Sequence, residues 1–411
     1  MRRLNILIVH QNFPGQFPHV AAALAARGDR VVAIGSKTAR EIPGVELRRY
    51  ALKRGNTPGT SAWLTKPESD LIRAEGAAEA ALSLRSDGFV PDVILGHSGF
   101  GEMIHLKEVF PKARMIAFGE MFYRTEGFDS GFDPEFAAIG FDRRLDVNAK
   151  NAGAALTCLL ADVIVSPTAF QASSYPPSLR DRIIVHHEGI DVPPAVRQPR
   201  KVRLAPSGLV LDGSQPLVTY ISRVLEPTRG FHTFMRALPA VMAARPEAQV
   251  VAIGGRLSTG YGAPTHDGRS WLDHMLDEVG AKIDQRRFHA MGTVEHGAMI
   301  DILSHSWAHV YLTIPFVLSW SLLEAMACEA PIIASDTAPV RDAIADGREG
   351  RLVDFFNADE LAEAIIHNLD NQAALHEQRA QARRTVQERF DRATVGVPGW
   401  LKIIDDVAAT A

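Results

Sequence analysis

Two arginines stand at the end of one apolar stretch, where a strand is expected to finish. Arg223 and Arg229 occur in SRVLEPTRGF, six positions apart and directly after PLVTYIS. Guanidinium groups match the oxygens of a diphosphate in charge and geometry, and they keep their protons at neutral pH. Solvated surface arginines are the alternative, and spacing alone does not decide between the two. The pair predicts an anion-binding loop if further suitable groups lie beside it.

A second polar group begins an apolar helix in LSWSLLEAMACEAPIIASD, residues 318–336. Ser321 and Glu324 have the S-x-x-E spacing of a capping box, so Glu324 can be a structural cap. The alternative is that the helix start offers free N–H groups to a phosphate while Glu324 binds ribose hydroxyls. Under that interpretation the candidate phosphate- and ribose-binding residues here are Ser319, Trp320, Ser321, Leu322 and Glu324.

Three further turns follow predicted strands. His97, in GHSGFGE, has an unperturbed pKa near neutrality and could carry a proton or contact a reacting group, or simply be a hydrogen-bonded loop histidine. In HQNFPGQF, Gly15 permits close backbone approach and Gln16 leads into a helix start. In MGTVEHG, Thr293 and Val294 could offer backbone groups to a base.

The elements that must position these residues are short apolar strands alternating with helices. NILIVH, FPHVAAALAARG and RVVAIG have the order strand, helix, strand, and residues 216–255 repeat that order. Such units form parallel sheets with helices on both faces. The sequence predicts two doubly wound Rossmann-like α/β domains, whose ligands lie beyond the carboxyl ends of the strands. The candidate residues follow those ends.

The predicted domains are residues 1–192, residues 193–393 and a C-terminal helix at 394–411 that could cross back to the first domain. The boundary rests on the proline-rich stretch at 191–216, which has the composition of a linker.

Composition excludes several classes of protein. The chain has 411 residues and a net charge of −4, so it lacks the basic field that nucleic acid or an anionic membrane would require. Cys158 and Cys328 lie in apolar segments, which suggests neither a disulfide framework nor a zinc site. MRRLNILIVH is too short to be a signal segment. We expect a cytoplasmic protein, at most peripheral to the inner face of a membrane.

Several stretches together resemble the retaining glycosyltransferases of family 4, which have the GT-B architecture of two Rossmann-like domains facing a central cleft. They are NFPGQFPHVAAALAARGDRVVAIG, HEGID, SRVLEPTRGFHTFMRALP, MGTVEHGAMIDILSHSWAHVYLT and LLEAMACEAPIIASDTAPVRDAIADGREGRLV. The resemblance implies a nucleotide-sugar donor, with UDP or GDP as the expected nucleotide, bound by the second domain. It also implies a hydroxyl acceptor of unknown identity bound by the first domain, and transfer with retention of configuration.

The family's functional residues fall on particular positions of this chain. Arg223 and Arg229 resemble its basic pair on the donor diphosphate, and Glu324 resembles the second glutamate of its E-x7-E motif, which binds ribose. His97 looks like its active-site histidine, and Gly15 like its first-loop glycine.

The chain also departs from the family pattern. Phe316 occupies the position of the first glutamate, which contacts the donor sugar in the family, and arginine replaces the usual lysine. No D-x-D occurs, so we expect no metal and no cofactor.

Two alternatives stay open: a nucleotide-sugar 2-epimerase of similar architecture, and a non-catalytic nucleotide-sugar-binding protein, which Phe316 motivates. An NAD-dependent enzyme is disfavoured because neither first loop carries the glycine trio. Some aromatic residues could line the acceptor side together with Glu120, although core packing suits most of them better: Trp63, Phe118, Phe122 and Tyr123.

Overall fold

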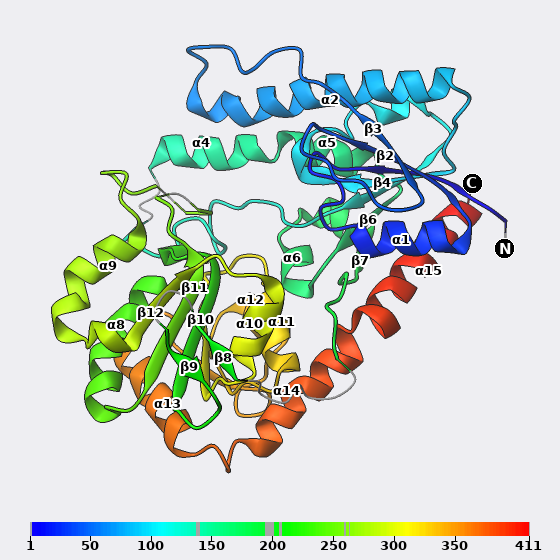
Figure 1. Ribbon diagram of the computed structural model, residues 1–411. Coiled ribbons are helices and arrows are strands. Elements are labelled where there is room, and N and C mark those ends of the chain that lie inside the picture. Colours follow the sequence, from blue (N-terminus) through cyan, green and yellow to red (C-terminus); the bar gives the residue numbers. More distant parts are fainter. Residues whose placement is uncertain are drawn as a thin grey trace. The chain divides into compact units, whose positions relative to one another are not determined.

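The chain forms two α/β units. The computed structural model describes residues 2–136, 140–193, 201–204, 208–258, 260–262 and 264–410 (Figure 1). Unit 1 contains Met1–Gly131, Ile139–Gly189 and Arg392–Ala411, and unit 2 contains Phe132–Ala138 and Ile190–Asp391. The structure divides between residues 189 and 190, three residues before the predicted boundary at 192/193. The C-terminal segment from Arg392 belongs to unit 1.

Unit 1 is built on a parallel sheet with the strand order β3-β2-β1-β4-β5-β6-β7. Its strands are β1 (Asn5–Val9), β2 (Arg30–Gly35), β3 (Val45–Arg49), β4 (Val93–His97), β5 (Arg114–Phe118), β6 (Val163–Ser166) and β7 (Ile183–Val185). The order reverses at β1, which pairs with β2 on one side and β4 on the other. Such a reversal opens a crevice at the carboxyl ends of the two central strands, where His10 and His97 lie.

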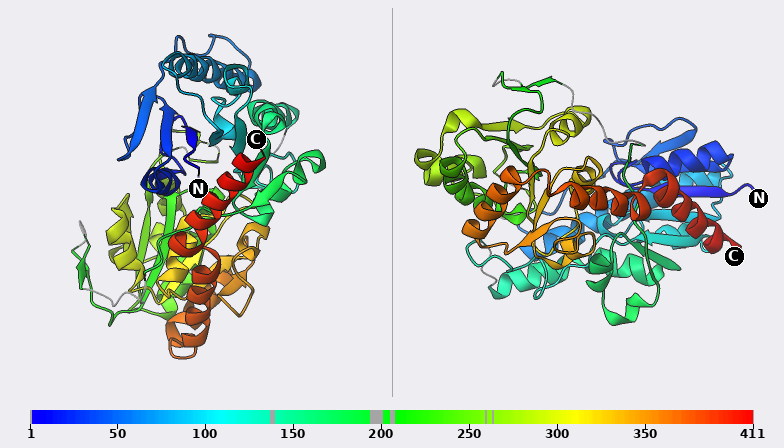
Figure 2. Two further views of the ribbon diagram at one scale, coloured as in Figure 1. Left: turned by 90° about the vertical axis from the view of Figure 1, so that its right-hand side faces the viewer. Right: turned by 90° about the horizontal axis from the view of Figure 1, so that it is seen from below.

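Helices cover both faces of this sheet because its strands are apolar on both sides. Their bounds are α1 (Pro18–Arg27), α2 (Ala62–Ser86), α3 (Leu106–Val109), α4 (Phe141–Lys150), α5 (Ala152–Leu160), α6 (Ala169–Ser173), α7 (Pro177–Arg180) and α15 (Val397–Ala409). One face packs against α2, α3 and α5, while the other packs against α1 and α15. Figures 1 and 2 show α15, in red, beside α1, where Trp400 is fully buried.

Unit 2 repeats this plan with the strand order β12-β11-β10-β13-β14-β15. Its strands are β10 (Leu217–Val224), β11 (Gln249–Gly255), β12 (Phe288–Gly292), β13 (Ala308–Tyr311), β14 (Ile332–Ser335) and β15 (Arg351–Val353). Here the order reverses between β10 and β13; Arg223 lies at the carboxyl end of β10 and Arg229 in the turn that follows it. The predicted fold of two doubly wound α/β domains is therefore confirmed.

The helices of unit 2 surround its sheet. They are α8 (Phe231–Ala244), α9 (Trp271–Val279), α10 (His296–Leu303), α11 (Trp320–Ala327), α12 (Ala338–Arg341), α13 (Ala358–Asp370) and α14 (His376–Arg389). One core cluster joins the sheet to α10, α11 and α14. Within the described ranges, no helix is both long and apolar enough to cross a lipid bilayer.

Part of the predicted linker is structured. Val202–Arg203 (β8) pairs antiparallel with Val210–Leu211 (β9), so this stretch forms a small hairpin and is not a plain linker. Its residues 194–200 and 205–207 lie outside the described ones. Leu204 and Leu211 are buried in the core of unit 2, and this burial holds the hairpin to the unit.

Candidate active site

In unit 1, His97 ends β4 with its ring almost completely buried. The backbone N–H of Gly99 donates a 2.9 Å hydrogen bond to His97 Nδ1. That bond requires a lone pair on Nδ1, so the neutral ring carries its proton on Nε2. His97 Nε2 lies 3.6 Å from Glu120 Oε2, and the ring stacks on Phe100 at 4.2 Å. A neutral His97 is therefore oriented as a hydrogen-bond donor at Nε2.

His10 lies beside His97, at the end of β1, with ring centroids 5.8 Å apart. The predicted strand NILIVH includes His10 as its last residue. In the structure β1 ends at Val9, and His10 is the first polar residue at the end of a buried strand, as His97 is at the end of β4. Its Nδ1 accepts a 3.0 Å hydrogen bond from the backbone of Asn12. A Cβ at Gly15, where φ is +53°, would lie 2.4 Å from the His10 ring. Glycine is thus required at position 15 for the packing of His10.

Glu120, after β5, links the two histidines. Gln16 Nε2 donates a 3.4 Å hydrogen bond to Glu120 Oε1. Burial works to raise the pKa of the Glu120 carboxyl, but interaction with His97 and the hydrogen bond from Gln16 outweigh it and hold that pKa below its ordinary value. Burial, together with the neighbouring His97, lowers the pKa of His10 to about 3. The cluster at neutral pH thus combines a carboxylate with a neutral His10.

A buried charge cluster on α2 supports the turn after His97. Lys66 Nζ donates to the carbonyl of Gly99 at 2.8 Å, and Arg73 Nε donates to that of Phe100 at 2.6 Å. Both cations pair with Asp70, which is 1% exposed. Burial lowers the pKa of Lys66. The cluster fixes the backbone that sets the orientation of the His97 ring.

In unit 2, Arg229 is buried, with 7% of its surface exposed, in the short 3₁₀ turn before α8. Its Nη1 donates to Thr313 Oγ1 at 2.7 Å, to the carbonyl of Val317 at 3.1 Å and to the hydroxyl of Tyr311 at 3.3 Å. Within the described part of the chain, Arg229 forms no ion pair with a carboxylate. A buried cation held only by neutral groups is costly unless an anion joins it.

Arg223 is more exposed and lies next to Tyr261. Its Nη1 donates to the Tyr261 hydroxyl at 3.3 Å, and its guanidinium carbon stands 5.7 Å from the centre of the Tyr261 ring. The Arg229 guanidinium carbon lies at the same distance from that ring. The structure therefore brings the two predicted arginines together around one aromatic side chain. Sequence reasoning missed Tyr261, which stands alone in a glycine-rich loop.

The N-terminus of α11 is joined to Arg229 through Tyr311. The Tyr311 hydroxyl contacts Arg229 and accepts a 2.9 Å hydrogen bond from the backbone of Ser319. Ser319 is the N-cap, and its side chain accepts from the N–H of Ser321. The capping-box alternative for Ser321 and Glu324 is therefore wrong, because the helix begins two residues earlier and Glu324 lies in its second turn.

Glu324 instead pairs with a histidine that the sequence analysis did not single out. His296 Nε2 lies 2.6 Å from Glu324 Oε1, and Glu324 is 13% exposed at its side chain. His296 begins α10, so the loop between β12 and α10 that carries Thr293 and Val294 lies beside α11.

The predicted residues at the start of α11 differ in what they expose. Leu322 is buried in the core, so only its backbone could meet a ligand, whereas Trp320 is 38% exposed. Gly15, Gln16 and His97 belong to unit 1, while the other candidate residues belong to unit 2.

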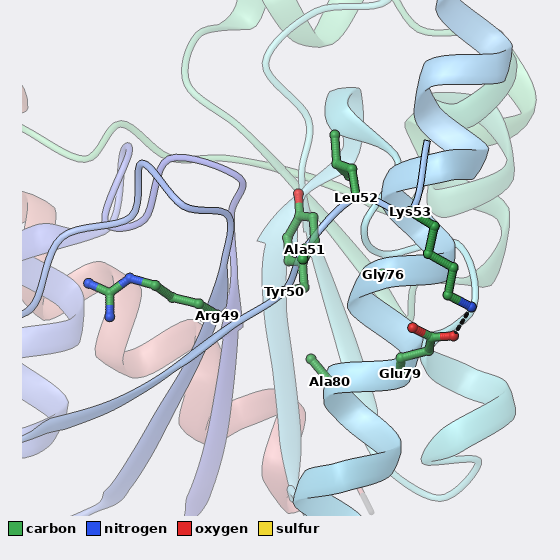
Figure 3. Close-up of a pocket in the computed structure, with 8 residues that line it drawn as sticks. All are labelled: Arg49, Tyr50, Ala51, Leu52, Lys53, Gly76, Glu79 and Ala80. Carbon is green, nitrogen blue, oxygen red and sulfur yellow. Dashed lines mark hydrogen bonds and ion pairs between the residues drawn. The ribbon is translucent and has the colours of Figure 1, made fainter. Parts of the chain in front are cut away.

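A pocket of about 290 Å³ in unit 1 lies away from these clusters (Figure 3). It lies between α2 and the segment that follows β3, and Lys53 and Glu79 form an ion pair at its edge. Its lining residues are Arg49, Tyr50, Ala51, Leu52, Lys53, Gly76, Glu79 and Ala80, none of which the sequence analysis selected. In the described residues, no group of three or more His, Cys, Asp or Glu side chains could hold a metal ion.

Two family profiles match the chain in succession. The profile described as Glycosyl transferase family 4 group matches residues 27–194, and Glycosyl transferases group 1 matches residues 206–388. A phosphatidyl-myo-inositol mannosyltransferase of Propionibacterium freudenreichii is 27% identical over 186 residues, or 45% of this chain and 42% of that protein. The matched region thus spans less than half the length of this curated relative.

Two solved structures share the fold. Sucrose-phosphate synthase from Thermosynechococcus elongatus superimposes with a TM-score of 0.71 and 17% identity, covering 100% of both chains. Anabaena Alr3699/HepE, solved in complex with UDP and glucose, gives a TM-score of 0.64 and 14% identity, covering 98% of this chain and 100% of its own. Both units and both profiles lead to one conclusion: the chain has the GT-B fold and belongs to the group 1 glycosyltransferases of family 4.

Proposed function

We propose that the protein transfers a sugar from a nucleotide-sugar donor to a hydroxyl acceptor, with retention of the anomeric configuration. Membership of a glycosyltransferase family supports the reaction class. The matched relative is named as a mannosyltransferase, which supports transfer of a hexose, and one structural neighbour was solved with UDP and glucose, which supports UDP as the donor nucleotide. GDP is the second nucleotide that we propose.

The observation that carries this proposal is the buried, carboxylate-free Arg229. Its guanidinium is held by neutral oxygens at the carboxyl ends of the central strands and is joined through Tyr311 to the N-terminus of α11. The guanidinium carbons of Arg223 and Arg229 both lie 5.7 Å from the centre of the Tyr261 ring. A diphosphate would supply the missing negative charge, and a helix N-terminus adds favourable potential for it.

The same groups suit the chemistry of the leaving diphosphate. Cleavage of the bond between sugar and phosphate leaves negative charge on the departing oxygens. Arg223 and Arg229 stay protonated, so they can stabilise that charge, although they cannot act as proton donors. Preorganised donors of this kind contribute about 3 to 4 kcal/mol each in favourable cases. We propose that transfer needs no metal ion, since the arginines can fulfil this role.

Glu324 is the proposed ribose ligand, and His97 is the proposed group that meets the reacting sugar or the acceptor hydroxyl. His296 holds the Glu324 carboxylate from the adjacent loop. His97 offers its Nε2 proton beside the Glu120 carboxylate. A hydroxyl placed there could accept from His97 and donate to Glu120, which is a hydrogen-bonding pair that positions an alcohol.

Calorimetric titration tests the donor site. Wild-type protein is titrated with UDP, GDP, ADP and dTDP, and the Arg229→Ala variant is compared with Arg245→Ala, which removes a partly exposed arginine paired with Asp370. We expect Arg229→Ala to weaken the best nucleotide by about a hundredfold, or about 2.7 kcal/mol, and Arg245→Ala to leave it unchanged. Equal affinity in both variants contradicts the site.

Turnover is then measured with sugar derivatives of that nucleotide and a panel of hydroxyl acceptors, with and without a chelator. Transfer with retention that survives the chelator supports the proposal. Epimerised donor in the absence of an acceptor would identify an epimerase, and binding with no transfer to any acceptor would favour the non-catalytic alternative.

A further inference from the structure

Tyr261 forms the exposed surface over the two arginines. Its ring is 5.7 Å from the guanidinium carbon of Arg223 and 5.7 Å from that of Arg229, while 47% of the residue remains exposed. An anion held by both guanidinium groups would therefore lie next to this ring. A group attached to that anion would therefore contact the Tyr261 ring.

Phe316 supports Tyr261 from behind. The two ring centroids are 5.1 Å apart at an interplanar angle of 55°, and Phe316 is only 7% exposed. The Arg229 guanidinium carbon stands 5.5 Å from the centre of the Phe316 ring. This side of the arginine site is thus an aromatic wall, and the Phe316 side chain has no atom that could bind a hydroxyl group.

The carboxylate that contacts the Tyr261 loop is already hydrogen-bonded to the protein. Glu226 is fully buried, and its two oxygens accept 3.0 Å hydrogen bonds from the backbone N–H groups of Tyr261 and Gly262. A Cβ at Gly260 would lie 2.2 Å from Glu226 Oε2. Glu226 therefore fixes the backbone of the Tyr261 loop, and its complete burial keeps its carboxylate away from a ligand.

We propose that Tyr261 is the wall of the donor site that faces the sugar, and that it selects nucleotide sugars presenting hydrogen or a methyl group where common hexoses carry a hydroxyl. This inference rests on the proposed function, because it places a donor diphosphate on the arginines. Aromatic faces pack well against C–H groups, whereas a hydroxyl pressed against them loses water without gaining a partner.

The expected selectivity is moderate. An apolar wall rejects an added hydroxyl weakly, whereas a site built to bind a hydroxyl strongly rejects the analogue that lacks it. We therefore expect at least one monodeoxy analogue to bind about tenfold more tightly than its parent, which is the size of effect an unpaired hydroxyl produces.

The experiment uses the nucleotide that binds best, its glucose derivative and the 2-, 3-, 4- and 6-deoxy analogues of that derivative. Calorimetry compares the wild type with Tyr261→Phe, Tyr261→Ala and Phe356→Ala, the last an exposed aromatic of unit 2 outside this wall. We expect Tyr261→Phe to keep the deoxy preference and Tyr261→Ala to lose it. Tyr261→Ala should also weaken the nucleotide sugars at least tenfold more than the bare nucleotide.

The outcomes separate the inference from the function beneath it. Tight binding of the bare nucleotide, with no deoxy analogue binding more tightly than its parent, overturns the inference and leaves the donor site intact. The same holds if Tyr261→Ala weakens the nucleotide and its sugars equally. If no nucleotide binds the wild type, both the inference and the proposed function fail. Unchanged melting temperatures confirm that the variants fold.

Discussion

The carboxyl ends of the two sheets carry opposite kinds of chemistry on the same architecture. In unit 1 the central strands end in His10 and His97, with Glu120 following the neighbouring strand. In unit 2 the equivalent strand ends carry Arg223 and Arg229. The Tyr311 hydroxyl joins Arg229 to the N-terminus of α11. One site can change its protonation, and the other carries permanent positive charge.

This difference assigns separate tasks to the units. Guanidinium groups bind an anion at every relevant pH, but they cannot move a proton. Imidazole and carboxylate groups suit a hydroxyl that donates one hydrogen bond and accepts another. A fold repeated twice has thus kept its geometry at the strand ends and changed the residue types there. Variants in one unit should alter one task and spare the other.

The largest effect should come from unit 1. We expect His97→Ala to lower the rate of transfer by about 10²- to 10⁴-fold, because the hydrogen bond to the reacting hydroxyl is lost. The affinity for the bare nucleotide should stay within about twofold of wild type, since its proposed ligands lie in unit 2, and such a difference is below about 0.5 kcal/mol. Steady-state kinetics and calorimetry measure the two quantities.

Exposed His376, at the start of α14, provides the matched control for this variant. His376→Ala should leave both the rate and the affinity unchanged. A His97→Ala variant that lost nucleotide affinity to the same extent as activity would remove the division of tasks.

The second prediction contrasts the two sites by pH. His10 has its pKa lowered from 6.5 to about 3 by burial, so the unfolded chain binds its proton at a higher pH than the folded one does. Stability is therefore complete above about pH 6.5 and falls as pH drops toward 3. At pH 4.5 the loss is about 2 to 3 kcal/mol.

Hydrogen exchange of the β1 amides measures this loss within unit 1 alone. The His10→Gln variant should flatten the pH dependence between pH 7 and 4.5, whereas Arg229→Lys should leave it unaltered. An unchanged slope in His10→Gln would mean that other groups account for the acid sensitivity of unit 1. Their identity would then have to be sought among the carboxylates, because they titrate in the same range.

Sequence periodicity predicted the elements well where burial was uniform. The predicted strand RVVAIG agrees with β2 to the residue, and the strand, helix and strand predicted within residues 216–255 are β10, α8 and β11. The edge strand β3, VELRR, was not predicted. None of its side chains is fully buried and three of them are charged, so it lacks the apolar run that indicates a buried strand. The strand-end rule also selected His97 and both arginines correctly as residues that lie at the carboxyl ends.

The missing parts of the site depend on contacts between segments distant in sequence. Tyr261 and Glu226 are 35 residues apart, with α8 and β11 between them, and no local pattern marks such a contact. His296, the first residue of α10, contacts Glu324 in α11, 28 residues further along the chain. His10 was overlooked for a different reason. It was included in the predicted strand NILIVH, although β1 ends at Val9 and His10 is the first residue after it.

A third prediction separates charge from geometry at the anion site. Arg229→Lys keeps the positive charge but loses the planar fork that can bind two oxygens at once. We expect nucleotide affinity to fall about tenfold, or about 1.4 kcal/mol, which is less than in Arg229→Ala. Calorimetry at two salt concentrations checks this, because a remaining point charge should still show salt dependence. Affinity equal to wild type would mean that charge alone determines binding.

The smallest predicted effect concerns Glu324, which the geometry of α11 excludes as a capping-box residue. Ser319 caps α11, so Glu324 is not needed to begin the helix, and its partner His296 is 63% exposed at its side chain. An ion pair with one partner in solvent is screened by water, so we expect it to contribute at most about 1 kcal/mol to stability. Glu324→Gln should lower donor affinity about fivefold, since a neutral acceptor replaces a charged one on the ribose, while the free energy of unfolding changes by less than about 0.5 kcal/mol.

Removing the partner alone distinguishes a ligand from a structural pair. His296→Gln breaks the ion pair and leaves the carboxylate available, so donor affinity should hold or rise slightly, whereas Glu324→Gln should lower it. Calorimetry with the best nucleotide sugar and urea unfolding of both variants provide the measurements. If the two variants lost stability equally and donor affinity not at all, Glu324 would act only to join α10 to α11. Donor recognition in unit 2 would then depend on Arg223, Arg229 and the helix N-terminus alone.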